Sequence, residues 1–155
     1  MPDFSKTRIF AGVPAAAMVA MGIRGTPKMF SAGTTLMEQG DPGSAMYVIL
    51  DGRVRVERQR SDLGEPLVLA ELGPGQVVGE IAVLDGEPRS ATVTAVEETQ
   101  TMELTADVLT DVMLQFPEVA RALLRTLSGR LRSTDEFVEQ ALRRGRLTNL
   151  EVGTL

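Results

Sequence analysis

The sequence predicts an α+β fold, in which a jelly-roll-like antiparallel β-roll is flanked by an N-terminal helix and two C-terminal helices. Between Lys28 and Thr105, short apolar or alternating runs are separated by Gly, Pro and Asp, which is typical of a small antiparallel β architecture. On both sides of this region, apolar residues recur at helical spacing instead. The 155 residues, of which 43% are hydrophobic, are enough for one domain with a substantial core.

The N-terminal segment, residues 1–25, is expected to contain a helix over residues 14–21, with Pro14 in the first turn, where proline is favoured. Lys6 and Arg8 precede an apolar run, and together they superficially resemble a secretory signal. A proline interrupts that run, however, and the run is too short to span a membrane. We therefore expect an uncleaved helix and no contact with a membrane.

The β region and the helix after it, residues 26–116, form the second predicted unit. Asp51-Gly52 separates an apolar run from a strictly alternating run, which is a strong signal for a hairpin between the two strands. A second hairpin is expected to turn near residues 62–64. The expected strands are residues 29–30, 35–37, 45–50, 53–57, 67–72, 90–96 and 100–104.

Two helices are expected after the strands. Thr105 is a suitable N-cap for a helix over residues 106–115, and Pro117 starts a second helix at the position that proline prefers. This long C-terminal helix, residues 117–145, is expected to end at Gly145. The last ten residues, 146–155, then form a tail.

The long helix carries apolar residues at heptad spacing, with Thr134 at the remaining position of the seam. This spacing favours pairing with another helix, and hence a possible homodimer. Packing of the helix on its own β-roll is the alternative, which explains the first half of the helix better than the second. The apolar positions are Ala120, Leu124, Leu127, Leu131, Val138 and Leu142.

The composition limits the chemistry of this chain. His and Cys are absent, which excludes Cys/His zinc sites, Ser-His-Asp and Cys-His nucleophile systems and haem attachment. Binding is therefore favoured over catalysis, and we expect neither catalytic residues nor a metal site. The lack of Cys also suits a reducing cytoplasm, where we expect the protein to be located.

The charge distribution argues against nucleic-acid binding by this chain itself. The net charge is -5, whereas a surface that binds nucleic acid is basic. The basic residues are nearly all arginines, half of them between Arg121 and Arg146, where acidic residues are interspersed. We interpret these arginines as the solvated face of the long helix.

The segment from Gly79 to Val93 carries the most specific chemical pattern. Gly79 precedes an expected helix start, whose free N–H groups favour an anion. A turn then brings the chain back, so that Arg89 can fork onto phosphate oxygens, with Ser90 adding a hydroxyl. The carboxylate of Glu80 would repel phosphate but suits a sugar hydroxyl. Together these residues predict a site for a nucleotide with a free 2′-hydroxyl.

This segment closely resembles the phosphate-binding cassette of cyclic-nucleotide-binding domains, such as those of the catabolite activator and of protein kinase A regulatory subunits. The shared pattern is Gly-Glu, small or apolar residues, a short turn, and Arg-Ser-Ala before a strand. The loop 38–41, the strand residues 46–49 and Gly52 resemble a second hallmark of the family. The resemblance runs from about Thr26 to Arg144 and implies the same order of helix, β-roll and two helices.

The resemblance implies a role for each matching residue around the phosphate and the ribose. Glu80 would accept a hydrogen bond from the 2′-hydroxyl, and Arg89 would neutralise the cyclic phosphate. Gly79 would allow the ligand to approach closely. The groups that would assist Arg89 are Ser90 and the backbone N–H groups of Ile81, Ala82 and Ala91.

The resemblance also places the base over Leu69 and Ala70 and under the C-terminal helix. Thr134 and Asp135 stand where the catabolite activator contacts the adenine amino group. Asp135 departs from the family's Thr-Ser, and its carboxylate suits an adenine amine and the N–H groups of guanine equally. Thr134 has the alternative interpretation of a polar residue tolerated in a helix seam.

We therefore expect a receptor for a cyclic nucleotide, cAMP more than cGMP, that needs no cofactor and signals through its C-terminal helices, with a hinge near Phe116-Pro117. A ligand-free β-roll serving interaction or dimerisation is the main alternative, and an enzyme acting on nucleotides is a weaker one. The chain ends soon after Gly145, without room for the helix-turn-helix module of the catabolite activator. It is expected to be a stand-alone sensor or the sensor part of a larger regulator with an unidentified effector.

Overall fold

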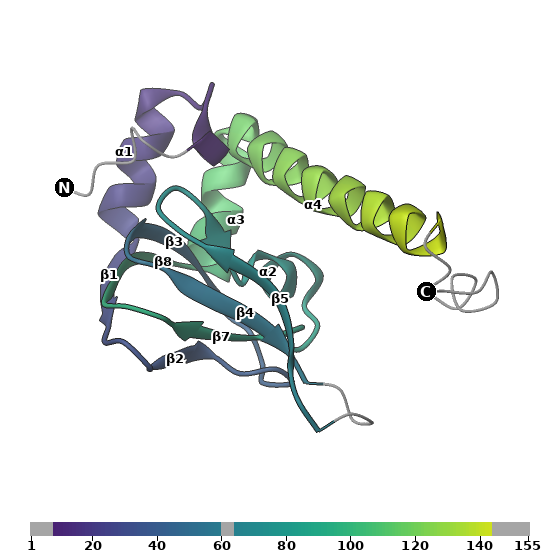
Figure 1. The fold of residues 1–155 in the computed structure, drawn as a ribbon. Helices are drawn as coiled ribbons and strands as arrows, with labels where there is room; N and C mark the ends of the chain where they lie inside the picture. The colour runs from purple at the N-terminus through teal and green to yellow at the C-terminus, as the bar shows by residue number, and fades with distance from the viewer. Residues whose placement is uncertain (1–7, 60–63, 144–155) are drawn as a thin grey trace.

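The computed structural model describes residues 8–59 and 64–143 and confirms the predicted α+β class. Two four-stranded antiparallel sheets form the β-roll, and helices lie beside it (Figure 1). The strand order is β1-β8-β3-β6 in the first sheet and β2-β7-β4-β5 in the second. The strands are β1 Thr26–Phe30, β2 Thr35–Met37, β3 Ala45–Asp51, β4 Val54–Arg58, β5 Leu67–Leu72, β6 Val77–Val78, β7 Thr92–Ala95 and β8 Thr99–Thr105.

The central strand β3 explains how two apolar cores form, because successive side chains of a strand point to opposite faces. Met46 and Val48 lie in the core between the first sheet and the helices. Tyr47 and Ile49 lie in the core between the two sheets. A strand that is buried on both faces is apolar along its length, which is why this segment has the densest apolar run in the β region.

The predicted hairpin at Asp51-Gly52 is wrong. β3 pairs with β8 and β6 in the first sheet, whereas β4 pairs with β5 and β7 in the second. The turn therefore carries the chain from one sheet to the other. Gly52 has a φ of 97°, and a Cβ there would lie 2.5 Å from the Glu98 carbonyl oxygen. Glycine is thus required both by the backbone conformation and by the close approach of the neighbouring turn.

The second predicted hairpin forms, since β4 and β5 pair along their length. Its predicted turn at Asp62 and Leu63 lies outside the described residues. Within the pair, Val56 is opposite Ala70 and Glu57 is opposite Val68, so β5 contains one extra residue, Leu69. This is the arrangement of a β-bulge, which re-aims side chains locally.

The helices follow the predicted order, with small shifts at their ends. A short 3-10 helix, η1 (Arg8–Phe10), precedes α1 (Ala15–Arg24), which starts after Pro14 and continues past the predicted end. Helix α2 (Glu80–Asp85) begins after Gly79 as expected. The two-residue strand β6 was not predicted, because two residues are too few to show a periodicity.

The C-terminal helices are α3 (Ala106–Gln115) and α4 (Pro117–Arg143). The Thr105 side chain caps α3 by accepting a hydrogen bond from the Val108 N–H at 3.3 Å, as predicted. Phe116 separates the two helices, and α4 then runs unbroken to Arg143. The predicted end at Gly145 and the tail 146–155 lie outside the described residues.

Helix α4 has two apolar faces. Val119 and Leu123, at most 1% exposed, pack with Ala122 into the helix-side core. Leu124 and Leu131 of the predicted seam are 62% and 65% exposed instead. The first half of α4 therefore packs on its own domain through residues other than those of the seam, and the rest of the helix extends away from the β-roll (Figure 1).

Across the two described ranges, 8–59 and 64–143, no helix combines the length and the apolar character needed to cross a bilayer.

Candidate functional site

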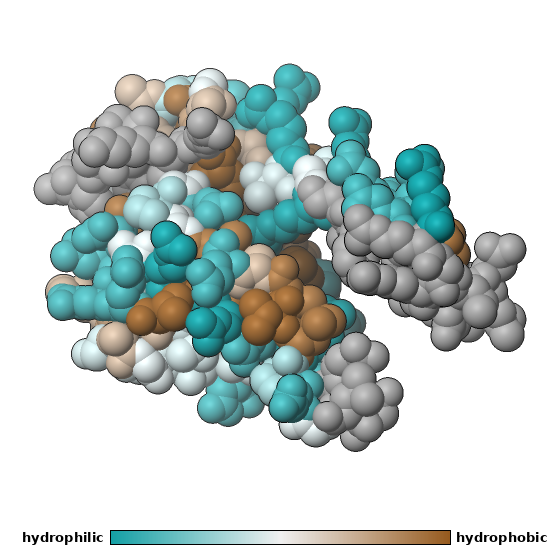
Figure 2. Space-filling model, viewed as in Figure 1, coloured by the Kyte–Doolittle hydropathy of each residue, from teal (hydrophilic) through white to brown (hydrophobic). Residues whose placement is uncertain are grey.

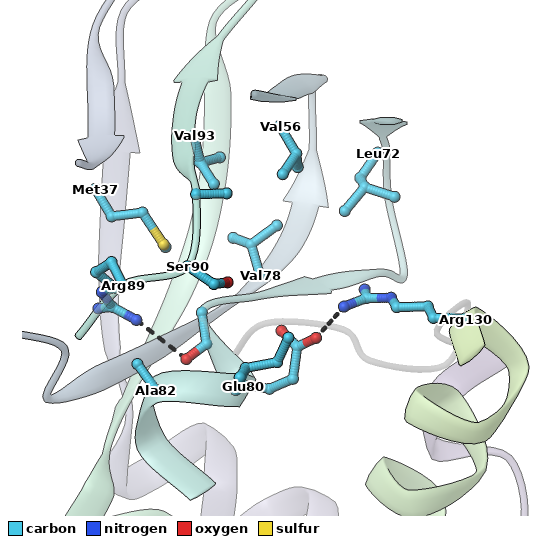
Figure 3. Close-up of a pocket in the computed structure, with 13 residues that line it drawn as sticks. Met37, Val56, Leu72, Val78, Glu80, Ala82, Arg89, Ser90, Val93 and Arg130 are labelled. Carbon is cyan, nitrogen blue, oxygen red and sulfur yellow. Dashed lines mark hydrogen bonds and ion pairs between the residues drawn. The ribbon is translucent and has the colours of Figure 1, made fainter. Parts of the chain in front are cut away.

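A cavity of about 80 Å³ lies between α2, the second sheet and α4 (Figure 3). Charged side chains of Glu80, Arg89 and Arg130 lie along one edge of the cavity, and apolar side chains form the opposite wall. The cavity brings together every residue that the sequence assigned to the phosphate and the ribose. Those residues are Gly79, Glu80, Ile81, Ala82, Arg89, Ser90 and Ala91.

The local fold of residues 79–91 explains this grouping. Gly79, in the left-handed region at φ 84°, turns the chain into α2, and Gly86, at φ 73°, ends the helix. The Asp85 carboxylate accepts a hydrogen bond from the Glu87 N–H at 2.8 Å, which stabilises the turn after the helix. The chain then returns, so Arg89 lies beside the start of α2, as predicted.

Arg89 is buried, with 7% of its surface exposed. Its Nη1 donates a hydrogen bond to the Gly79 carbonyl at 3.0 Å, and its Nη2 donates to the Ala45 carbonyl at 2.7 Å. Its Nε is also buried and has no hydrogen-bond partner among the described residues. Burial lowers the pKa of Arg89, but a guanidinium stays charged in proteins. The site thus holds a buried cation with a donor that an anion could satisfy.

Glu80 is 2% exposed, and its carboxylate forms an ion pair with Arg130 of α4. Arg130 Nη2 also donates a hydrogen bond to the Val77 carbonyl at 2.8 Å. Burial raises the pKa of Glu80, and the positive charge of Arg130 opposes this rise. A carboxylate has about four lone-pair sites, so this ion pair leaves capacity for a ribose hydroxyl.

Arg130 was missed as a site residue. The interpretation of the arginines between residues 121 and 146 as a solvated face is wrong for Arg130, because its side chain is only 37% exposed and contacts the Glu80 carboxylate and the Val77 carbonyl. A signal was present in the sequence. Arg130 lies one helical turn before Thr134, and residues four apart share a helix face.

Ser90 and Ala91 line the cavity next to Arg89. The Ser90 carbonyl accepts a hydrogen bond from the Arg58 Nε at 3.1 Å. This contact ties the end of β4 to the segment that carries Arg89. The segment is therefore anchored on the sheet side as well as on the helix side.

The apolar wall differs from the residues that the sequence assigned to the base. Leu69 and Ala70 do not line the cavity. They belong to the bulged part of β5 opposite Val56, which does line it. Leu69 is 46% exposed. Figure 2 shows apolar surface on the face of the molecule that is turned toward the viewer. The wall residues that the sequence missed are Met37, Val56, Leu72, Val78 and Val93.

The predicted base contacts on α4 are not part of the cavity as it stands. Asp135 is exposed and does not line the cavity, whereas Arg130, about one turn earlier on α4, does. The side chain of Thr134 lies outside what the structure describes. The proximal half of α4 thus reaches the cavity edge, and the predicted base contacts lie further along the helix.

A second hollow, about 380 Å³, is also lined by Arg89. Lys28 and Glu103 form an ion pair there at 2.8 Å, and burial, together with a hydrogen bond to Glu103, raises the pKa of Tyr47. The negative charge of Glu103 favours the charged form of Arg89. Arg89 therefore lines both hollows, and the negative charges of Glu80 and Glu103 favour its charged form.

The charged side chains of the cavity are those of two arginines and one glutamate. Among the side chains that the structure describes, no group of three or more His, Cys, Asp or Glu residues is arranged to hold a metal ion. The charge of the cavity comes from Arg89, Arg130 and Glu80. These groups suit a ligand that carries both an anion and hydroxyl donors.

Known proteins share this architecture. The cyclic nucleotide-binding domain family matches residues 27–116. A CRP-like cAMP-activated global transcriptional regulator from Mycobacterium tuberculosis is 32% identical over 131 residues, which are 84% of this chain and 58% of the regulator. The catabolite activator protein of Thermus thermophilus matches with a TM-score of 0.78 and 32% identity, over 85% of this chain and 62% of that chain. The N-terminal domain of a transcriptional regulator from Streptomyces coelicolor matches with a TM-score of 0.69 and 33% identity, over 86% of this chain and 96% of that domain.

The fold and the site together define a regulatory sensor domain built on a β-roll. The chain belongs to the cyclic nucleotide-binding domain family, as the resemblance of residues 79–93 indicated. It spans 58% of the length of the Mycobacterium tuberculosis regulator and 62% of the Thermus thermophilus protein.

Proposed function

We propose that this chain is a receptor for a cyclic nucleotide, with cAMP preferred over cGMP, and that α4 reports the bound nucleotide. The observation that carries the proposal is the position of Arg89 and Glu80 at one edge of a cavity whose far wall is apolar. A buried donor without a partner, such as the Arg89 Nε, costs about 1–3 kcal/mol of stability. A cyclic phosphate that accepts a hydrogen bond from this donor would remove that cost. Glu80 suits the ribose hydroxyl, and the apolar wall suits a base.

The preference for cAMP rests on one observation: the Mycobacterium tuberculosis relative is described as cAMP-activated. Asp135 is compatible with this preference, because it can accept a hydrogen bond from an adenine amine if α4 moves over the base or if a second copy supplies the residue. Guanine remains the alternative base, since its N–H groups would suit the same carboxylate. The contacts of Ser90 with the phosphate are part of the same proposal.

The signalling step follows from the size of the cavity. At about 80 Å³ it is smaller than the roughly 300–1,000 Å³ of most ligand pockets, so entry of a nucleotide requires its walls to separate. Arg130 lines the cavity, so α4 is one of the elements that would have to move. Phe116 lies between α3 and α4, at the position where a hinge is expected. A nucleotide shifts the position of α4 only by its difference in affinity for the two arrangements.

Thermal unfolding with cAMP, with cGMP and without nucleotide tests the proposal, because a ligand of the folded state raises the midpoint. Titration calorimetry then compares the wild type with Arg89→Ala and Glu80→Ala. We expect each variant to lose roughly tenfold or more in affinity, since each removes a charge-assisted contact. Arg53→Ala, whose side chain is 58% exposed on the sheet surface, is the control and should bind normally.

Two results would contradict the proposal in different ways. Unchanged affinity in either site variant would overturn the residue assignment. No binding of either nucleotide would favour a ligand-free interaction or dimerisation module. Recovery of unaltered cAMP after incubation would separate a receptor from an enzyme acting on nucleotides.

A further inference from the structure

Gly43, in the loop between β2 and β3, touches two parts of the cavity edge at once. A Cβ built on Gly43 would lie 2.6 Å from the Ala82 Cβ, 2.8 Å from the Arg89 Nε and 2.9 Å from the Arg89 Cδ. Figure 3 shows Ala82 and Arg89 at the same end of the cavity. The backbone at position 43 therefore lies directly against both the start of α2 and the side chain of Arg89.

Space, and not backbone conformation, requires glycine at this position. Gly43 is absent from the glycines with positive φ, so its backbone suits any residue. Gly40, in the same loop, shows the opposite case. It has a φ of 89°, but a Cβ there would meet no atom within 4 Å. A methyl group at position 43 would therefore test contact alone.

The contacts of Gly43 cannot relax without moving the site. The Cβ of Ala82 is fixed to the backbone of α2, and the residue is 3% exposed. Arg89 is held along its length. Its N–H donates to the Asp41 carbonyl at 2.7 Å, its carbonyl accepts from the Gly40 N–H at 2.9 Å, and its guanidinium is bonded to two further carbonyls. A side chain at position 43 must therefore displace the loop, α2 or Arg89.

We propose that Gly43 is a positioning residue for the phosphate site: its missing side chain allows the β2–β3 loop to set the distance between Arg89 and the start of α2. This inference rests on the proposed function, because it assigns these two elements to the phosphate of a cyclic nucleotide. Gly43 itself does not line the cavity. It acts through the separation of the groups that do.

The test measures the cAMP affinity of four variants and the wild type by titration calorimetry, with thermal unfolding of each ligand-free protein alongside. Gly43→Ala should bind cAMP roughly 5- to 100-fold more weakly, since forcing a methyl group into a packed site is costly. Gly73→Ala is the matched control. Its φ is not positive and its added Cβ would lie 3.8 Å from the nearest atom, so its affinity should not change.

The double variant Gly43→Ala/Ala82→Gly distinguishes positioning from a general loss of stability. It removes the Ala82 methyl group, which the new side chain meets at 2.6 Å, but leaves the contacts with Arg89 Nε and Cδ, so it should recover part of the lost affinity. Ala82→Gly alone is the second single variant needed for a double-mutant cycle, which measures the coupling between the two positions. Because glycine is unfavourable inside a helix, the double variant is expected to regain affinity without regaining full thermal stability.

Each outcome decides the inference. Wild-type affinity in Gly43→Ala would overturn it while leaving the proposed function intact. Weak binding that the second substitution does not improve at all would also overturn it, as would unfolding of both Gly43 variants, since Gly43 would then serve the fold. If the wild type itself bound neither cAMP nor cGMP, the proposed function would fail and this inference would fall with it.

Discussion

At the scale of single residues, the ion pair between Glu80 and Arg130 joins a buried carboxylate to a partly exposed guanidinium. The Glu80 side chain is 2% exposed, whereas that of Arg130 is 37% exposed. Loss of the pair is therefore asymmetric. Arg130 could regain hydration by turning toward solvent, but a buried Glu80 carboxylate would remain without its counter-charge.

Replacing Arg130 tests this asymmetry. Arg130→Ala should lower the free energy of unfolding by about 1–3 kcal/mol at neutral pH, because the carboxylate stays buried. Urea denaturation followed by circular dichroism measures the change. Arg132→Ala is the control, because Arg132 is exposed on the same helix and should have little effect. Equal midpoints for the two variants would show that the pair contributes nothing to stability.

The raised pKa of Glu80 leads us to expect that the free energy of unfolding depends on pH. Burial raises its pKa above the ordinary value of 4.5, so the folded protein keeps this proton to higher pH than the unfolded chain does. Stability therefore falls as pH rises from about 4.5 through the raised pKa. Glu80→Gln removes this loss, so it should gain stability relative to the wild type as the pH is raised. Urea titrations across the acidic range measure the difference, and a difference independent of pH would contradict the expectation.

Residues near one another in the sequence were the predictable part of the site. Gly79, Glu80 and Arg89 lie in one segment, where a helix start and a turn bring them together by local rules. Arg130 is 50 residues from its partner Glu80. The role of Arg130 depends on where α4 packs. By its charge alone, Arg130 cannot be distinguished in the sequence from the exposed arginines of the same helix.

At the scale of elements, strand positions were predictable, but strand partners were not. Alternation and the Asp51-Gly52 turn located β3 and β4, since both signals are local. Pairing depends on competition among all strands, and β8 and β6 occupy both sides of β3. The turn was therefore placed correctly but given the wrong partner strands. The apolar wall of the cavity was missed for the same reason, because it combines side chains from five strands.

The crossing at Gly52 makes a prediction about stability. Gly52→Ala combines an unfavourable positive φ with a contact of 2.5 Å, whereas Gly40→Ala imposes a positive φ in open space. We expect Gly40→Ala to cost about 1–2 kcal/mol. Gly52→Ala should cost roughly 1–3 kcal/mol more, as overpacking does. Chemical denaturation of the two variants measures the difference, and equal losses would show that the crowding at Gly52 relaxes freely.

At the scale of the whole molecule, α4 joins the cavity edge at Arg130 to an exposed apolar surface at Leu124 and Leu131. The heptad spacing predicted a seam on α4 that pairs with another helix, and two of its residues, Leu124 and Leu131, are exposed, whereas the pairing itself stays a prediction. It did not reveal that Val119 and Leu123 fix the start of the helix to the domain, because that contact depends on η1 and α3. The first half of α4 is thus anchored to the domain.

The last prediction concerns pairing through this surface. If two copies pair along α4, Leu131→Asp should shift the protein from dimer to monomer, because a carboxylate would be buried in the seam. Sedimentation equilibrium measures the dissociation constant. Leu114→Asp is the control, since Leu114 is 78% exposed on α3, outside the seam, and should leave the constant unchanged. A monomeric wild type, or a dimer that survives Leu131→Asp, would contradict pairing through the seam.

The same variant tests whether pairing and nucleotide binding are coupled. Leu131 follows Arg130 in the sequence, so the seam and the cavity edge share one turn of α4. If cAMP favours the arrangement of α4 that pairs, the factor by which cAMP tightens the dimer must equal the factor by which dimer formation tightens cAMP binding. Leu131→Asp should then weaken cAMP binding by that factor while retaining the buried contacts of Arg89 and Glu80. Equal cAMP affinities for a monomeric variant and a dimeric wild type would show that the two events are independent, and that α4 signals within one subunit.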